Sequence, residues 1–177
     1  MKVVIITGSA HKHGTTAVLT DKFQQGAIDA GHDVFRFDAA FHEVHPCIGC
    51  DKCRRTGECT FAADDMKRLN PYLLGADVVV FVSPIYYFTL NAQLKAVIDR
   101  FYANDDALHG RKKAALITAM ADTDPDTASG ANTAFRQTAK YLEWEIVGIL
   151  NAKNASAAAD LSKEDLNATY ELGKGLK

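Results

Sequence analysis

The chain has 177 residues, of which 47% are hydrophobic and 24% charged, which suits one domain with a sizeable core and excludes a disordered protein. Its formal net charge of −2 excludes the basic surface of a nucleic-acid-binding protein. No apolar run approaches the roughly 18 residues of a membrane span, and none resembles a signal peptide. We therefore expect a cytoplasmic protein with neither nucleic acid nor membrane as a partner.

Short runs rich in β-branched residues alternate along the chain with helical patterns. In chain order the sequence predicts a strand at 2–7, a helix at 15–30, a strand at 33–38, a helix at 64–74, a strand at 77–83, a helix at 91–103, a strand at 113–120, a helix at 131–142, a strand at 145–150 and a helix at 162–173. Asn70-Pro71 should kink the second of these helices or delay its start.

Five alternations of strand and helix in one chain favour a parallel sheet with helices on both faces. Right-handed crossovers then predict an α/β, flavodoxin-like three-layer sandwich, with a five-stranded parallel sheet in the order 2-1-3-4-5. We expect a single domain over 1–177. Its two long connections, 39–63 and 121–130, are of a length that usually carries function.

A run rich in glycine and hydroxyl groups, TGSAHKHGTT (7–16), joins the first strand to the first helix. A phosphate group needs converging N–H donors, small residues and hydroxyls, and a helix N-terminus adds a favourable dipole. The residues that meet these needs are Gly8, Ser9, Gly14, Thr15 and Thr16. His11 and Lys12 either add positive charge there or are solvated, as we expect for His13. An ordinary turn capped by threonine is the alternative interpretation.

All four cysteines lie within fourteen residues, PCIGCDKCRRTGEC (46–59), inside the long connection 39–63. In a reducing compartment such clustering favours metal binding or catalysis over structural disulfides. The C-x2-C-x2-C spacing is close to that of a bacterial ferredoxin, although five residues precede the last cysteine. We predict a [4Fe–4S] cluster bound by Cys47, Cys50, Cys53 and Cys59. Structural zinc, a reactive Cys47/Cys50 pair and thiols without metal remain alternatives.

The third strand ends in SPIYYFT (83–89). In a doubly wound sheet ligands bind beyond the carboxyl ends of the strands, at the switch point between strands one and three. A proline followed by aromatic residues at that point would form a rigid apolar wall for a planar ring. A core cluster that caps the sheet is the alternative. Together with the phosphate loop on the adjacent strand, this wall predicts an FMN site.

These motifs resemble the NADPH-dependent FMN reductase family, in particular its iron–sulfur flavoprotein branch. The resemblance covers roughly residues 1–120 and rests on GSAHKHGTT, the cysteine run followed by DDM (64–66), SPIYYF, and QLKAVIDRF (93–101). It implies that FMN binds non-covalently, with its phosphate on Ser9, Gly14, Thr15 and Thr16, and His11 alongside. It also implies that the flavin ring contacts Pro84, Ile85, Tyr86, Tyr87 and Phe88, and that the backbone from Ala119 to Asp122 adds further contacts.

The predicted function is an FMN-dependent oxidoreductase, which accepts electrons from NAD(P)H or a ferredoxin-like donor and passes them to a quinone, a flavin or another small acceptor. No residue is assigned as a catalytic acid or base, because the flavin carries the chemistry. A non-enzymatic electron carrier with FMN and a [4Fe–4S] cluster, serving a ferredoxin-like protein partner, is the alternative. A regulatory flavin-binding module is a third.

The expected assembly is a homodimer or homotetramer, since the resemblance implies a shallow flavin site completed by a neighbouring subunit. We also expect the cysteine connection to lie at the carboxyl edge of the sheet. The thiols would then be within electron-transfer reach of the flavin.

Overall fold

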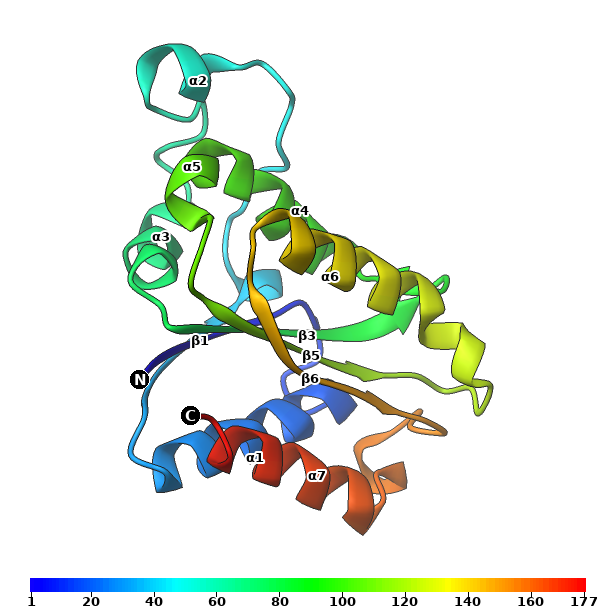
Figure 1. The fold of residues 1–177 in the computed structure, drawn as a ribbon. Helices are drawn as coiled ribbons and strands as arrows, with labels where there is room; N and C mark the ends of the chain where they lie inside the picture. Colours follow the sequence, from blue (N-terminus) through cyan, green and yellow to red (C-terminus); the bar gives the residue numbers. More distant parts are fainter.

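Five parallel strands form at the β-branched runs of the sequence, and they make up the central sheet of the computed structural model, which describes residues 1–177 (Figure 1). The strands are β1 (Lys2–Thr7), β2 (Asp33–Asp38), β3 (Val78–Tyr86), β5 (Lys113–Ala119) and β6 (Glu145–Ala152). Their order is β2-β1-β3-β5-β6, and every neighbouring pair is parallel. The predicted order and fold class are confirmed. A short sixth strand, β4 (Thr89–Leu90), pairs antiparallel with the end of β3 and was not predicted.

Helices cover both faces of this sheet (Figure 1). One face carries α1 (Thr15–Asp29) and α7 (Lys163–Lys174), and the other carries α3 (Met66–Leu74), α4 (Ala92–Asp99), α5 (Asp105–Leu108) and α6 (Ser129–Tyr141). Alternate residues of β1 supply the two cores: Val3 and Ile5 belong to the cluster that packs on α1, while Val4 and Ile6 belong to the cluster beneath the other helices. A strand buried on both faces must be apolar throughout, which explains its continuous hydrophobic run.

Two glycines allow α1 and α7 to approach closely. A Cβ atom on Gly26 of α1 would overlap the carbonyl oxygen of Tyr170, and one on Gly173 of α7 would overlap that of Phe23. The backbones of the two helices therefore touch at a point where any side chain would separate them. This contact fixes the position of α1 against the sheet, and with it the helix N-terminus that follows the loop after β1.

Several helix boundaries differ from the prediction. α3 begins at Met66 and continues through Pro71, so the proline is tolerated within the helix and the start is two residues later than predicted. The helix predicted at 91–103 is divided into α4 and a 3-10 turn, Arg100–Asn104, which leads into α5. A short helix, α2 (Lys52–Thr56), forms within the cysteine connection. No helix of the structure combines the length and the apolar character required to cross a bilayer.

Candidate flavin and thiol sites

A cavity with a volume of about 680 Å³ lies at the carboxyl ends of the parallel strands. Its walls come from the loop after β1, the end of β3, the end of β5 and the segment after β6. The lining residues are Ser9, Ala10, His11, Lys12, His13, Gly14, Thr15, Thr16, Pro84, Ile85, Tyr86, Ala119, Met120, Ala121, Ala155, Ser156, Ala157 and Ala158. Both the volume and the location are typical of a cofactor site in a doubly wound sheet.

The loop after β1 presents backbone N–H groups to this cavity. Gly14 is the N-cap of α1, has extended backbone and makes no side-chain cap, and the first turn of the helix contains no acidic residue. The first N–H groups of α1 therefore keep their hydrogen-bonding capacity, and the helix dipole favours an anion there. The Thr15 hydroxyl donates to the carbonyl of Ala155 at 3.2 Å, which joins the loop to the wall beyond β6. This chemistry fits a phosphate group.

A buried hydrogen-bond cluster holds this loop against the end of β3. The side-chain N–H group of Asn91 donates to the carbonyl of Gly8 at 2.6 Å. The Ser83 hydroxyl donates to Asn91 Oδ1 at 3.1 Å and accepts from the Asn91 backbone N–H at 3.0 Å. A Cβ on Gly8 would overlap Asn91 Oδ1, so the glycine permits this contact. Neither Ser83 nor Asn91 was assigned to the site from the sequence, in which Asn91 is only the first residue of the helix predicted at 91–103.

The aromatic run after β3 divides into two parts. Because β3 extends to Tyr86, its residues Pro84, Ile85 and Tyr86 line the cavity. Tyr87 and Phe88 do not line it; they form the turn between β3 and β4, with side chains 96% and 61% exposed. Both have positive φ, 47° and 66°, a conformation that is strained for bulky residues. Tight hairpins need this backbone geometry, which usually selects asparagine and glycine.

The loop after β5 lines the cavity with three of the four residues, 119–122, that the resemblance implies. Ala119 lines the cavity but Asp122 does not. The Asp122 carboxylate accepts hydrogen bonds from the backbone of Asp124, the hydroxyl of Thr127 and the backbone of Thr123, and these bonds lower its pKa. Asp122 therefore shapes its own loop. Met120 and Ala121 also line the cavity and lie within the range 119–122 that the resemblance implies, whereas the small residues Ala155 to Ala158, after β6, carry no recognisable motif and were not predicted.

The four cysteines line a second, much smaller cavity of about 20 Å³. All four are free thiols; Cys47 and Cys50 are exposed, while Cys53 and Cys59 are half-buried. The Cys50 sulfur lies 3.2 Å from the Thr60 hydroxyl, and this hydrogen bond lowers the pKa of the Cys50 thiol. The number and type of donors fit an iron–sulfur cluster. In this conformation, however, no three Cys, His, Asp or Glu side chains surround one point as metal ligands do.

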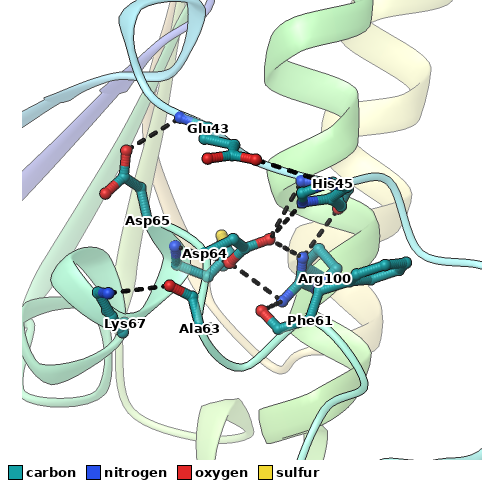
Figure 2. A network of polar contacts seen from close by, with 9 residues as sticks. Glu43, His45, Phe61, Ala63, Asp64, Asp65, Lys67 and Arg100 are labelled. Carbon is teal, nitrogen blue, oxygen red and sulfur yellow. Dashed lines mark hydrogen bonds and ion pairs between the residues drawn. The ribbon is translucent and has the colours of Figure 1, made fainter.

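The thiols do not lie beside the flavin cavity, so the expectation that they share its edge of the sheet is wrong. The two cavities have no residue in common. The thiol cavity is closed by Asp99, Arg100, Tyr102 and Ala103, at the far end of α4 from Asn91. Figure 1 shows α2 standing beyond α5, away from the β3–β4 hairpin. The connection leaves β2 at the carboxyl edge of the sheet but returns along the helical layer. There Arg100 donates to the carbonyl groups of His45 and Phe61, on either side of the cysteine run (Figure 2).

Comparison with known proteins agrees with this geometry. Residues 1–155 match the model of a family described as NADPH-dependent FMN reductase. An iron–sulfur flavoprotein of Archaeoglobus fulgidus is 27% identical over 98% of this chain and 77% of its own length. An iron–sulfur flavoprotein of Methanocaldococcus jannaschii is 33% identical over 56% of this chain, a match that spans only about half (51%) of that relative.

Solved structures show the same fold. An NAD(P)H:quinone oxidoreductase from Methanothermobacter marburgensis superposes with a TM-score of 0.76 over 99% of this chain and 95% of its own, at 16% identity. A flavone reductase gives a TM-score of 0.77 over 98% of this chain and 61% of its own, at 15% identity. The family match covers most of the chain, including the loop after β1, the cysteine connection and the end of β3. The chain therefore belongs to the NADPH-dependent FMN reductase family of FMN-containing oxidoreductases, as its motifs predicted.

Proposed function

We propose that this enzyme binds FMN in the 680 Å³ cavity, oxidises NAD(P)H or a ferredoxin-like donor, and reduces a small acceptor such as a quinone or a free flavin. The observation that carries the proposal is the meeting, in one cavity, of an uncapped helix N-terminus and a rigid strand end of proline, isoleucine and tyrosine. The first suits a phosphate and the second a planar ring.

Each wall of the cavity has a part in holding the cofactor. Ser9, Gly14, Thr15 and Thr16 would bind the phosphate through N–H groups and hydroxyls, with His11 beside it. Pro84, Ile85 and Tyr86 would contact the ring, while Tyr87 and Phe88 extend this surface past the rim of the cavity. FMN, when bound, supplies both hydride and single-electron transfer. The protein's part is to orient the ring, exclude water from one of its faces and leave the other open to a substrate.

We further propose that Cys47, Cys50, Cys53 and Cys59 bind a [4Fe–4S] cluster. Support comes from four free thiols around one cavity, and from the iron–sulfur flavoproteins among the relatives. Because Cys47 and Cys50 are exposed on an outlying loop, a protein partner has access to this end of the molecule. This exposure favours the second candidate function, electron transfer to or from a ferredoxin-like protein.

A homodimer or homotetramer is part of the same proposal. Tyr86, Tyr87 and Phe88 are 49%, 96% and 61% exposed at the rim of the proposed flavin site. Three large aromatic residues in succession on a free surface are unusual, and a neighbouring subunit would bury them.

Steady-state kinetics test the proposed function. The protein loaded with FMN should oxidise NADPH or NADH when a quinone or free FMN is supplied as acceptor. Rapid reduction by ferredoxin without such turnover would instead support the electron carrier. Failure to bind FMN would contradict both.

The cluster is tested with Cys59→Ser, which removes one of the four thiols. We expect this variant to lose its bound iron while keeping FMN, because Cys59 does not line the flavin cavity. Substitution of Ser156, which lies in the other cavity, by alanine is the matched control and should leave the iron content unchanged. Equal iron in wild type and Cys59→Ser would contradict the assignment of the ligands.

A further inference from the structure

A buried ion pair lies at the base of the cysteine connection. Arg100 Nη1 is 2.5 Å from Asp64 Oδ2, and the two side chains are only 3% and 2% exposed (Figure 2). A second contact of 3.4 Å joins Nη2 to Oδ1. Burying two charges is costly unless the remaining donors and acceptors are satisfied. The other partners of this pair therefore show what it holds together.

These partners lie at both ends of the cysteine run. Arg100 donates to the carbonyl of His45 at 2.8 Å and to that of Phe61 at 3.2 Å. Asp64 accepts from the backbone N–H of His45 at 3.1 Å and from that of Met66 at 3.0 Å. The rings of His45 and Phe61 also stack, with centroids 4.7 Å apart. The segment 46–60, with all four cysteines, is thus a loop closed at its base by one guanidinium and one carboxylate.

Arg100 also lines the cavity that the four cysteines surround. It lines a neighbouring cavity of about 170 Å³ as well, together with Cys59 and Asn70. Its Nε is buried and has no hydrogen-bond partner, and neither has Asn70 Oδ1. The guanidinium thus uses four hydrogen bonds to close the loop, and its fifth donor, the Nε–H group, has no partner.

A second set of contacts holds the tip of the loop, and it differs in kind. Arg54 of α2 pairs with Asp105 at 2.9 Å and with Asp106 at 3.2 Å, and its side chain is 37% exposed. The Tyr102 hydroxyl donates to Asp51 at 2.8 Å. Because Arg54 is partly exposed and Asp106 is 91% exposed, these pairs contribute less to stability than a fully buried pair, whose breaking is strongly destabilising. The base and the tip can therefore be tested separately.

We propose that Asp64 and Arg100 are positioning residues for the four-thiol site: they close the loop before any cluster binds and so keep the four cysteines around one small cavity. The inference rests on the proposed cluster. It assigns no catalytic role to either residue, because neither lines the flavin cavity.

The test variant is Asp64→Asn/Arg100→Gln, which removes both charges and leaves no uncompensated ion in the interior. The matched control is Arg54→Gln, which removes a guanidinium from the tip only. Hydrogen exchange is measured on the metal-free proteins in the peptides that cover 42–46 and 60–66. We expect exchange in these peptides to be faster by about tenfold or more in the double variant, and by about threefold or less in the control.

The second readout is iron release from anaerobically reconstituted protein to a chelator. We expect release to be faster by about tenfold or more in the double variant, with unchanged FMN affinity as the check that the domain is folded. Iron release and loop exchange equal to wild type would overturn the inference. A wild-type protein that takes up no iron would instead contradict the proposed cluster, so the two failures are distinct.

Discussion

At the scale of single residues, Asp64 shows how a buried charge makes the fold dependent on pH. Burial raises the pKa of Asp64, but the hydrogen bond from Arg100 and those from the backbone of His45 and Met66 outweigh it, so the pKa lies below its usual value. A lowered pKa means that the stabilisation is complete above about pH 3.9, the ordinary value for aspartate. It is lost as the pH falls through the folded-state pKa.

Asp64→Asn tests this directly. At pH 7 we expect the variant to be less stable by about 3–5 kcal/mol, because Arg100 is left without its counter-ion. As the pH falls below 4, the difference in the free energy of unfolding between wild type and variant should shrink. The wild-type carboxylate becomes protonated there and is then uncharged, like the amide of the variant. Urea unfolding of the metal-free proteins at a series of pH values measures the difference. A deficit that is constant down to pH 2 would contradict the role of the ionised Asp64.

The neighbouring tyrosines Tyr86 and Tyr87 offer a second residue-level test. Tyr86 lines the cavity, whereas the Tyr87 side chain is 96% exposed. Tyr86→Ala should weaken FMN binding by about tenfold through loss of an aromatic contact. Tyr87→Ala should change it by about twofold or less, because Tyr87 does not line the cavity. Fluorescence titration of the apoprotein with FMN distinguishes the two, and equal effects would show that the turn folds over the ring.

Site residues could be predicted where a short stretch of sequence fixes their position. Ser9, Gly14, Thr15 and Thr16 line the cavity as expected, because a strand-to-helix turn fixes their position within ten residues of chain. Asn91 and Arg100 were missed because their partners, Gly8 and Asp64, are distant in sequence and are brought near only by packing. The same holds for Ala155 to Ala158, whose small side chains give no signal of their own.

At the scale of elements, the closest helix contact is the one between α1 and α7. Gly26→Ala would improve helix propensity by about 1 kcal/mol. However, its Cβ would overlap the Tyr170 carbonyl, which belongs to a rigid backbone. We therefore expect a net loss of about 1–3 kcal/mol.

The matched control for this helix contact is Gly75→Ala, at the end of α3. Its Cβ would lie 3.4 Å from the Pro71 carbonyl, an ordinary contact, so stability should change by about 0.5 kcal/mol or less. Urea unfolding midpoints compare the two variants. A Gly26→Ala protein as stable as wild type would show that α7 moves freely away from α1.

The elements themselves were predictable wherever hydrophobic periodicity is strong. The five long strands lie at the β-branched runs, and β3 was underestimated only because its last residues, Pro84 to Tyr86, were interpreted as loop. By contrast, α2 has no buried residue, so no periodic pattern marks it. Its position depends on Arg54 and the carboxylates of Asp105 and Asp106, which lie about fifty residues further along the chain.

At the scale of the whole molecule, α4 connects the two candidate redox sites. At its start, Asn91 bonds to Gly8 at the phosphate loop; just past its end, Arg100 closes the cysteine loop. Eight helical residues span about 12 Å, so the sites are fixed relative to one another by a single rigid element. The sequence predicted both sites but not their separation, because the path of a long connection is set by its tertiary anchors.

The central claim is that one chain holds both FMN and an iron–sulfur cluster. The most direct measurement is the content of FMN, iron and acid-labile sulfide, together with the absorption spectrum, of protein purified without oxygen. We predict about one FMN, four iron and four sulfide per chain, with a broad brown absorption that reductant bleaches. Flavin bands without iron would contradict the cluster, and protein that neither contains nor takes up flavin would contradict the account as a whole.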